Sequence, residues 1–445
     1  MKASITKRHG VQGCSCGFAI DLPCEKLYNA NVSKKGCVYM PQQYTLLREM
    51  LPLHYIKESG RIMNFNLTEV QQDFVNLAKD FGENKLAPTI TERDHQGVFD
   101  RALVDEMLSL GFAGAYFEEK YGGIGEDGGD VLSYILAVEE LAKYDAGVSI
   151  TLSASVSLCA NPIWQFGTEE QKEKYLTPLV EGTKLGAFGL TEPNAGTDAS
   201  GQQTVATKDA DGNYILNGSK MFITNAGEAD IYIVFAMTDK SQGTKGISAF
   251  ILEKGMEGFT FGKKEDKMGI HTSQTMELVF QDVKVPKENL LGQEGKGFKI
   301  AMMTLDGGRI GVAAQALGIA EAALNDAVEY SKQRVQFGRP LCKFQSISFK
   351  LADMKMKIEA ARNLVYKAAF KKQEGQPFTV DAAIAKRVAS DVAMEVATEA
   401  VQIYGGYGYS EEYPVARHMR DAKITQIYEG TNEVQLMVTG GALLR

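Results

Sequence analysis

The sequence predicts an α+β protein of several domains, with a β domain between two helical domains. Its 445 residues are enough for two or three domains. Apolar residues recur at helical spacing in the first and last parts of the chain, whereas the period in between is two, as in strands. Helices, then strands, then helices favour separate helical and β domains. We expect four segments: an extension of unknown role at 1–62, a helical domain at 63–184, a β domain at 185–293 and a second helical domain at 294–445.

The first helical domain begins where the pattern changes at Met63. Thr68 is the predicted N-cap of a helix, because a threonine hydroxyl accepts a hydrogen bond from the first helical turn. Apolar residues follow at three- and four-residue spacing: Phe74, Leu77, Ala78 and Phe81. Further helices are expected over 101–110, 130–144 and 169–179.

The β domain and the last helices have equally clear signals. Strands rich in β-branched and aromatic residues are expected over 231–235, 247–252 and 276–280. Asp209–Asn213 predicts a hairpin turn, Asn217-Gly218 a second turn, and Val285-Pro286 the end of a strand. Long helices are expected over 298–333, 345–373 and 379–403.

Residues 1–62 differ in composition from the rest. They hold nine of the 48 Lys and Arg residues and only four of the 56 Asp and Glu residues. Met1–Ile20 is basic, hydroxylated and free of acids, which resembles an organelle presequence, although acids follow it. Four cysteines in this segment lack the paired spacing of a zinc module. An alternative is that the protein begins at Met63.

Composition and motifs exclude several classes of protein. A net charge of −8 argues against a nucleic-acid-binding surface, and no uninterrupted apolar run approaches the roughly 18 residues of a membrane span. A Walker loop, a His-rich metal motif and a Ser/His/Asp context are missing. Gly123–Gly128 has glycines at dinucleotide-binding spacing, but no strand precedes it, and Glu126 and Asp127 would face a pyrophosphate with negative charge. We therefore interpret it as a loop.

One unusual segment is Gly189–Gly201, which joins a strand-like run to a turn dense in hydroxyls and glycines. Its backbone amides and the side chains of Thr191 and Thr197 could donate to a polar ring or a phosphate. The same residues also form ordinary hairpin loops, so both interpretations stay open.

A second unusual stretch runs from Gln402 to Glu433. Gln402–Tyr409 ends a helix in glycines, which permit close approach of a bulky ligand. Further on, Glu429 lies between apolar Ile427 and Tyr428 on one side and a Gly-Thr break on the other. A partly desolvated carboxylate there would have a raised pKa, which suits proton abstraction. The alternative is an exposed acid that starts a helix.

These segments carry a family resemblance. Gly189–Gly201 and Gln402–Asp421 match, at their defined positions and in the right order, two long patterns of the acyl-CoA dehydrogenases. The sequence thus resembles this family over Met63–Arg445, and Leu305–Leu324 and Arg420–Gln435 are most similar to its short-chain, butyryl-CoA group. The resemblance implies an N-terminal α-helical domain, a middle antiparallel β-barrel-like domain and a C-terminal four-helix bundle.

The resemblance also implies FAD and a set of site residues. Those implied around the isoalloxazine ring are Phe188, Leu190, Thr191, Thr197, Phe222 and Thr224. Those implied to reach the FAD of a neighbouring subunit are Arg334, Gln336, Phe337, Gln345, Gln402, Gly405 and Gly406. Thr431 and Glu433 match positions near the pyrophosphate and adenosine. The positions implied to bind acyl-CoA are Thr197, Asp306, Arg309, Tyr428 and Gly430.

The implied reaction is α,β-dehydrogenation of a short-chain acyl-CoA to the trans-2-enoyl-CoA. Glu429 would remove the α-proton while a hydride leaves for flavin N5, and position 308, where some subgroups place their base, is a glycine here. Implied partners are an electron-transfer flavoprotein and three further subunits in a dimer of dimers. Alternatives are an acyl-CoA oxidase, an enoyl-CoA reductase, or a non-catalytic flavoprotein or acyl-CoA-binding partner. The expected compartment is the cytoplasm if the chain is bacterial, otherwise an organelle matrix.

Overall fold

The computed structural model describes residues 66–125 and 129–444. The predicted extension at 1–62 therefore lies outside the described residues, as do Glu126, Asp127 and Gly128 of the rejected dinucleotide pattern.

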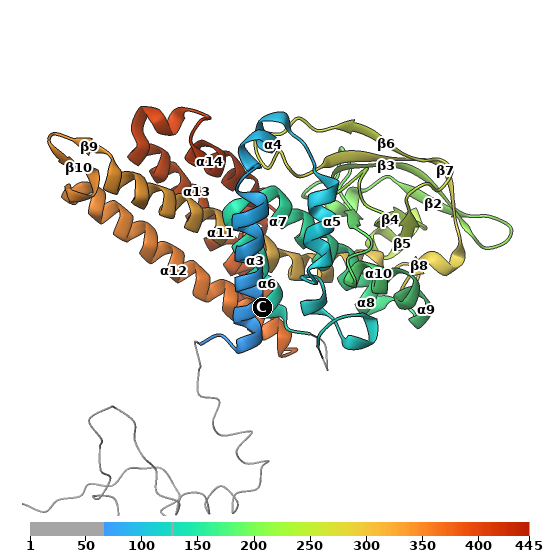
Figure 1. The fold of residues 1–445 in the computed structure, drawn as a ribbon. Helices are drawn as coiled ribbons and strands as arrows, with labels where there is room; N and C mark the ends of the chain where they lie inside the picture. Colours follow the sequence, from blue (N-terminus) through green and yellow to red (C-terminus); the bar gives the residue numbers. More distant parts are fainter. Residues whose placement is uncertain (1–65, 126–128, 445) are drawn as a thin grey trace, which may run out of the picture. The chain divides into compact units, whose positions relative to one another are not determined.

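The first part of the described chain is helical (Figure 1). Thr68 caps α3 as predicted, because its hydroxyl accepts from the Gln71 amide while the Gln71 side chain accepts from the Thr68 amide. Gly-rich turns and short π-helical stretches separate the elements. Their bounds are α3 Glu69–Phe81, η3 Gly82–Leu86, α4 Ile90–Gln96, α5 Arg101–Ser109, α6 Val131–Tyr144, α7 Ala146–Ser153, η6 Ala154–Ala160, α8 Asn161–Phe166, α9 Glu169–Gln171, η7 Lys172–Leu176 and α10 Thr177–Val180.

A continuous helical run over Ala146–Phe166, comprising α7, η6 and α8, was not predicted. It is the one helix among residues 66–125 and 129–444 that is long and apolar enough to cross a membrane, and its apolar window is 100% buried inside the protein. The run packs against the β domain, where the Ser155 hydroxyl accepts from the Gly186 amide and the Thr151 carbonyl accepts from Asn225. A helix that is apolar on all sides has no 3.6-residue period to detect.

The middle part is a single eight-stranded sheet in the order β6-β7-β3-β2-β4-β5-β8, with β1 paired to β4. Most pairings are antiparallel, but β1–β4 and β2–β4 are parallel, so the sheet is mixed. The strands are β1 Gly186–Gly189, β2 Val205–Lys208, β3 Tyr214–Thr224, β4 Ile231–Met237, β5 Ile247–Glu253, β6 Phe259–Lys264, β7 Thr275–Val285 and β8 Leu290–Leu291.

The predicted hairpin over Asp209–Asn213 joins β2 to β3, but the turn predicted at Asn217-Gly218 is wrong. These two residues lie inside β3, at an irregularity in its pairing with β7. Gly218 has φ 141°, and its side-chain space is filled by Thr204, so the glycine accommodates a bulge and close packing rather than a turn.

Three long helices dominate the last part. Figure 1 shows α11, α12 and α13 running to the left, with the β9–β10 hairpin at their far end from the large sheet. Their predicted bounds are confirmed to within one residue. The elements are α11 Gly297–Gln333, β9 Val335–Gln336, β10 Arg339–Pro340, α12 Gln345–Gln373, α13 Thr379–Tyr404, α14 Pro414–Thr425 and α15 Asn432–Leu443. The predicted α+β order of domains is thus confirmed.

Candidate active site

Glu429 lies in the short connection between α14 and α15. Its φ of 53° is in the left-handed region, which is uncommon for a residue with a side chain, and Gly430 follows with φ 90°. The connection is closed by a hydrogen bond from the Asn432 amide to the Gln426 carbonyl, 3.0 Å long. Strained backbone of this kind persists only where surrounding contacts fix it, and it is found most often at functional sites.

The Glu429 carboxylate lies over Gly308 in α11. A Cβ built on Gly308 would overlap Glu429 Oε2 and approach within 2.6 Å of Leu158 Cδ2. The missing side chain therefore provides the space that the carboxylate occupies. Glu429 Oε2 is buried and has no hydrogen-bond partner among the described residues, so it is available to a ligand.

Burial raises the pKa of Glu429 to about 7, against the opposing pull of three cations, Arg309, Lys386 and Lys372. The carboxylate therefore changes its protonation state near neutral pH. A base with its pKa close to the working pH combines a large ionised fraction with useful basicity. These physical properties fit the predicted role of Glu429.

Four of the five predicted acyl-CoA residues, Asp306, Arg309, Tyr428 and Gly430, lie on the two segments that flank this carboxylate. Arg309 is 5% exposed and donates to Asp306 over 2.5 Å, and the other Asp306 oxygen accepts from Thr379 over 2.7 Å. The Arg309 Nε is buried without a partner. On the other side, the Tyr428 hydroxyl donates to Gln315. The Gly430 carbonyl anchors the connection through hydrogen bonds from Lys386 and Gln435.

The residues predicted around the isoalloxazine ring come from two segments that the structure brings together. The Met221 amide donates to the Thr191 carbonyl over 2.8 Å, which places Leu190 and Thr191 beside Phe222. The ring of Phe222 is 61% exposed, at a residue with φ 60°. Thr224 ends β3, Phe188 lies in β1 against Phe235, and Thr197 is exposed in the loop that follows Leu190.

A buried ion pair supports the same two segments. Lys220 donates to Glu192 over 2.7 Å, and also to the Leu190 carbonyl over 3.2 Å. Glu192 accepts in turn from the Thr204 amide. An exposed aromatic ring at a left-handed residue, fixed by buried contacts on both sides, fits a flat apolar ligand such as an isoalloxazine ring.

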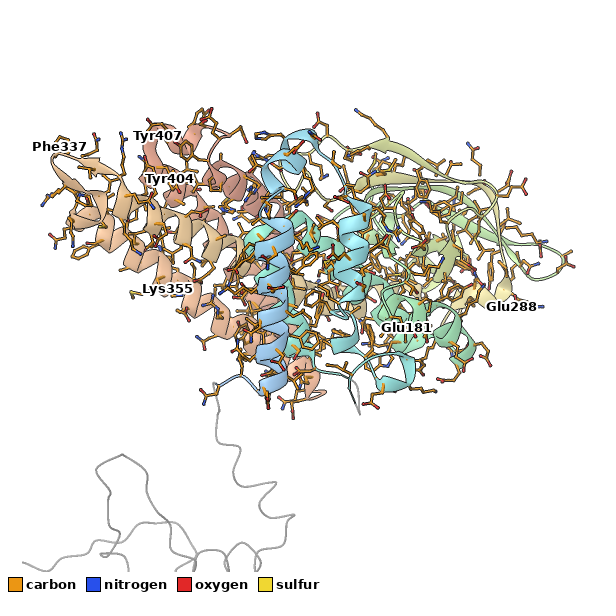
Figure 2. The ribbon with its side chains drawn as sticks, viewed as in Figure 1. Glu181, Glu288, Phe337, Lys355, Tyr404 and Tyr407 are labelled. Atoms are coloured by element: carbon orange, nitrogen blue, oxygen red, sulfur yellow. The ribbon has the colours of Figure 1, made fainter. Side chains whose placement is uncertain are left out.

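The residues predicted to reach a neighbouring subunit lie far from Glu429. Arg334 directly follows α11, 25 residues after Arg309, which corresponds to about 37 Å along a helix. Its guanidinium is 5.3 Å from the centre of the Tyr407 ring, beside Gly405 and Gly406. Figure 2 shows Phe337, Tyr404 and Tyr407 gathered at this end of the helices. Gln336 and Gln345 lie in β9 and at the start of α12, and Gln402 is in the last turn of α13.

Thr431 and Glu433 begin α15. Thr431 is the N-cap, its hydroxyl accepting from the Val434 amide, and Glu433 is exposed in the first turn. The alternative interpretation of Glu429 was an exposed acid that starts a helix, and this description applies to Glu433 instead.

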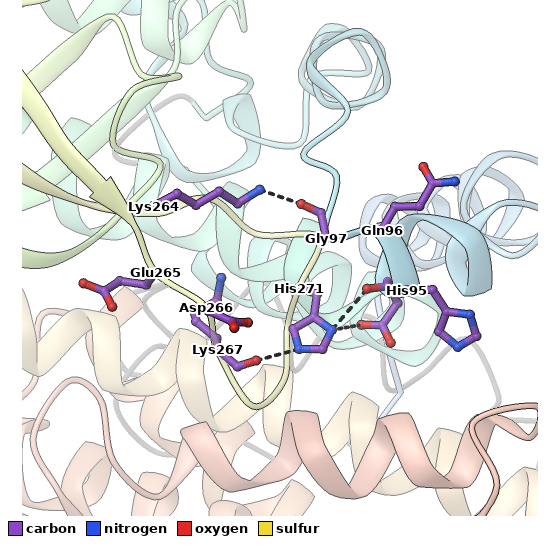
Figure 3. A pocket seen from close by; sticks show the side chains of 9 residues that line it. His95, Gln96, Gly97, Lys264, Glu265, Asp266, Lys267 and His271 are labelled. Atoms are coloured by element: carbon purple, nitrogen blue, oxygen red, sulfur yellow. Dashed lines mark hydrogen bonds and ion pairs between the residues drawn. The ribbon is translucent and has the colours of Figure 1, made fainter.

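A polar cavity of about 370 Å³ lies elsewhere, between α4 and the β6–β7 connection (Figure 3). It contains none of the predicted site residues. In its wall, His271 contacts the Asp94 side chain and the Lys267 carbonyl, and the hydrogen bond to Asp94 raises the pKa of the imidazole. Arg420 of α14 also binds Asp94, so these contacts join three parts of the chain structurally.

Comparison with known proteins agrees with the geometry. Models of the N-terminal, middle and C-terminal domains of acyl-CoA dehydrogenase match residues 68–183, 187–283 and 295–444. The chain belongs to the acyl-CoA dehydrogenase family. The predicted family is confirmed, as is the class of enzyme.

Similar proteins narrow the comparison further. A short-chain-specific acyl-CoA dehydrogenase of Megasphaera elsdenii is 87% identical over 86% of this chain and 100% of its own length. The solved butyryl-CoA dehydrogenase of that organism superposes with a TM-score of 0.85, at 87% identity, over 86% of this chain and 100% of its own. A chain in a structure of the electron transferring flavoprotein of Acidaminococcus fermentans also superposes with a TM-score of 0.85, at 68% identity, over 86% of this chain and 100% of its own. The predicted similarity to the short-chain group is thus confirmed.

Sequence reasoning missed the cations and amides that surround Glu429. Lys372, Lys386 and Gln435 belong to no recognised motif, lie in helices and are 57, 43 and 6 residues from position 429 in the sequence. One signal was available for Lys386. It follows Ala382 by four residues and precedes Ala389 by three, so it lies on the apolar face of its helix, where an unpaired lysine is costly.

Proposed function

We propose that this protein oxidises short-chain acyl-CoA esters, with butyryl-CoA as the reference substrate, to trans-2-enoyl-CoA, and that Glu429 is the base. The observation that carries the proposal is the buried, unpartnered Glu429 Oε2 over Gly308, with a pKa of about 7. The 87% identity to a butyryl-CoA dehydrogenase supports the substrate class.

Glu429 is suited to taking the α-proton of a thioester. Burial makes its carboxylate more basic than a solvated one, while Arg309 and Lys386 keep it ionised in part at neutral pH. The α-carbon must lie in contact with Oε2, and hydrogen bonds to the thioester oxygen must stabilise the negative charge that develops there. Gly308 and Leu158 lie against the carboxylate on one side, and exclusion of water by a bound substrate would strengthen both effects.

We further propose FAD as the cofactor, held by Leu190, Thr191 and Phe222 in one subunit. FAD, when bound, accepts the hydride. The exposed Phe222 ring supports this assignment. About 37 Å of helix separates Arg334 from Arg309, which lies beside the proposed acyl-CoA site, so Arg334 is too far along the helix to reach a ligand at that site within one chain. Arg334, Phe337 and their neighbours would then hold the FAD of another subunit, which requires an oligomer, in our proposal a dimer of dimers.

Electrons would pass to an electron-transfer flavoprotein, which the 68%-identical chain from the A. fermentans structure supports. The relative in Megasphaera elsdenii favours a bacterial cytoplasm as the compartment.

The test is an anaerobic visible spectrum of the purified holoenzyme before and after butyryl-CoA. We expect flavin absorbance that bleaches, with Glu429→Gln retaining flavin but losing bleaching by roughly 10²- to 10⁴-fold in rate, the usual contribution of a general base. Glu106→Gln, an exposed acid on α5, is the matched control and should bleach at the wild-type rate.

Bleaching at an undiminished rate in Glu429→Gln would refute the assignment of the base. Bleaching only by longer or branched acyl-CoAs would refute the chain length. Rapid reoxidation by oxygen in place of the electron-transfer flavoprotein would instead indicate an oxidase.

A further inference from the structure

We propose that Lys386 of α13 is the positioning residue that holds the Glu429 connection in its strained conformation. The proposal rests on the proposed role of Glu429 as the base. The Lys386 side chain forms no hydrogen bond with the predicted flavin positions. Of the predicted acyl-CoA positions, it contacts only Gly430, through the backbone carbonyl.

The first observation is a clamp on the backbone directly after the base. Lys386 Nζ donates to the Gly430 carbonyl over 2.9 Å, and Gln435 Nε2 donates to the same oxygen over 2.8 Å. Two donors from different helices therefore fix this carbonyl. Because its peptide unit begins at Gly430, which follows Glu429 directly, its orientation constrains the left-handed backbone that aims the carboxylate.

The second observation is that the clamp continues to both ends of the connection. Lys386 Nζ also donates to Asn432 Oδ1 over 3.0 Å. The Asn432 amide group donates to Asp391, one turn further along α13, over 2.8 Å. Gln426, at the start of the connection, donates to the same Asp391 oxygen over 2.7 Å. One face of α13 thus holds the segment from 426 to 432 at both ends and in the middle.

The third observation is that Lys386 is a cation in a buried position, where a charge is destabilising. Lys386 is 0% exposed, and burial lowers its pKa to about 7. The charged groups that face it are Glu429, Arg309 and Glu433 from other elements and Arg387 from its own helix. A buried lysine without a carboxylate in hydrogen-bond contact lowers the stability of the fold. We therefore attribute its presence to its hydrogen bonds with the connection and to its positive charge near Glu429.

Lys386→Met is a usable variant because it leaves no acceptor unpaired. The Gly430 carbonyl keeps Gln435 as a donor, and Asn432 Oδ1 keeps the Ser390 hydroxyl at 3.1 Å. Methionine fills a similar volume without a charge. Lys386→Arg keeps the charge and Lys386→Gln keeps a neutral donor. Lys208→Met is the control, because Lys208 is an exposed residue of β2 that pairs with Glu294.

The experiment measures anaerobic bleaching of holoenzyme by butyryl-CoA against substrate concentration and pH. We expect Lys386→Met to lower the limiting rate about 10²-fold, the effect of misplacing a catalytic group by about 1 Å, with the concentration for half-maximal rate little changed. Removing a positive neighbour raises the pKa of a carboxylate, so the acidic limb of the rate profile should move to higher pH. Lys386→Arg should return the acidic limb to its wild-type pH and restore part of the limiting rate.

A readout without catalysis accompanies the kinetics. Backbone amide hydrogen exchange in the peptide that contains 426–435 should accelerate in Lys386→Met and not in Lys208→Met, because local opening becomes easier once the clamp is lost. If Lys386→Met does not accumulate as folded holoenzyme, Lys386→Gln carries the same test.

The outcomes separate the two proposals. A limiting rate within threefold of wild type, with an unmoved acidic limb and unchanged exchange, overturns the role of Lys386 while an inactive Glu429→Gln leaves the base in place. A fully active Glu429→Gln overturns the base itself, whatever Lys386→Met does.

Discussion

The two ends of the C-terminal helical domain differ in what they leave unsatisfied. At the inner end, around Glu429, three buried polar atoms have no partner within residues 66–125 and 129–444, namely Glu429 Oε2, Arg309 Nε and Gln435 Oε1. At the outer end, around Arg334 and Tyr407, large rings are exposed instead, with Phe337 at 94% and Tyr409 at 90%. Unpaired buried polar atoms are suited to a small polar ligand held close. Exposed aromatic rings are suited to covering by a large flat or apolar surface.

This difference separates the chemistry from the assembly. The inner end obtains its geometry from contacts within one chain, as the bonds from Lys386 and Gln435 to the Gly430 carbonyl illustrate. In our proposal, the outer end is completed by another subunit that packs on it. Changes at the inner end should therefore alter rates, and changes at the outer end should alter flavin retention and subunit association.

The largest expected effect comes from filling the space over Gly308. In Gly308→Ala the new Cβ overlaps Glu429 Oε2, so the carboxylate must move and the bleaching rate should fall about 10²-fold. Gly441→Ala in the last turn of α15 is the control, because no described residue lies within 4 Å of a Cβ built there. Stopped-flow bleaching by butyryl-CoA measures both. Equal effects of the two substitutions would contradict a specific role for position 308.

The next effect is a pH dependence. Burial raises the pKa of Glu429 to about 7, and a base acts only when it is ionised. The apparent second-order rate constant for bleaching should therefore rise about tenfold per pH unit below 7 and level off above it. A profile that is flat between pH 5.5 and 8 would show that another group is the base (these limits lie roughly one unit or more on either side of the pKa).

At the outer end, Phe337→Ala should loosen the flavin without changing the fold. Aromatic contacts contribute about 0.5–1.5 kcal/mol beyond area, so the dissociation constant for FAD should rise up to about tenfold. Equilibrium dialysis measures the flavin, and light scattering measures the mass of the assembly. Phe74→Leu in α3, in the N-terminal helical part, controls for loss of an aromatic ring. An unchanged FAD affinity and mass would mean that the outer end does not take part in assembly.

The smallest effect is expected from Tyr407→Leu, which removes the ring under Arg334. An exposed cation–π contact is worth about 0.5–1 kcal/mol, so flavin affinity should fall about two- to fivefold through a less ordered guanidinium. A larger loss, with a change in bleaching rate, would mean that the two ends are coupled.

Periodic segments were predictable from the sequence. The long helices α11, α12 and α13 and the strands β4, β5 and β7 appear where they were predicted. The strands β4 and β5 are buried on both faces, so their β-branched and aromatic residues were the signal rather than an alternating pattern. The raised pKa of Glu429 was also predictable, since a carboxylate between apolar residues and a glycine break is a local pattern, while its role as the base stays a proposal.

Features that depend on distant contacts were not predictable. Asn217-Gly218 has the composition of a turn, and only its pairing with β7 shows a bulge inside a strand. The clamp by Lys386 requires two segments more than 40 residues apart to meet. The run from Ala146 to Phe166 has no polar face, because the helices and the sheet cover all of it.

The length of α11 has a consequence for how such proteins can vary. This single helix of 37 residues carries Gly308 and Arg309 near one end and leads directly into Arg334 at the other. One inserted residue would advance everything beyond it by 1.5 Å and rotate it by about 100°. The hairpin that carries Phe337 would then point in another direction while the base stayed in place. The length of the helix thus sets both the distance and the rotation between its two ends. Insertions should be tolerated in the surface loops of the β domain long before they are tolerated between residues 309 and 334.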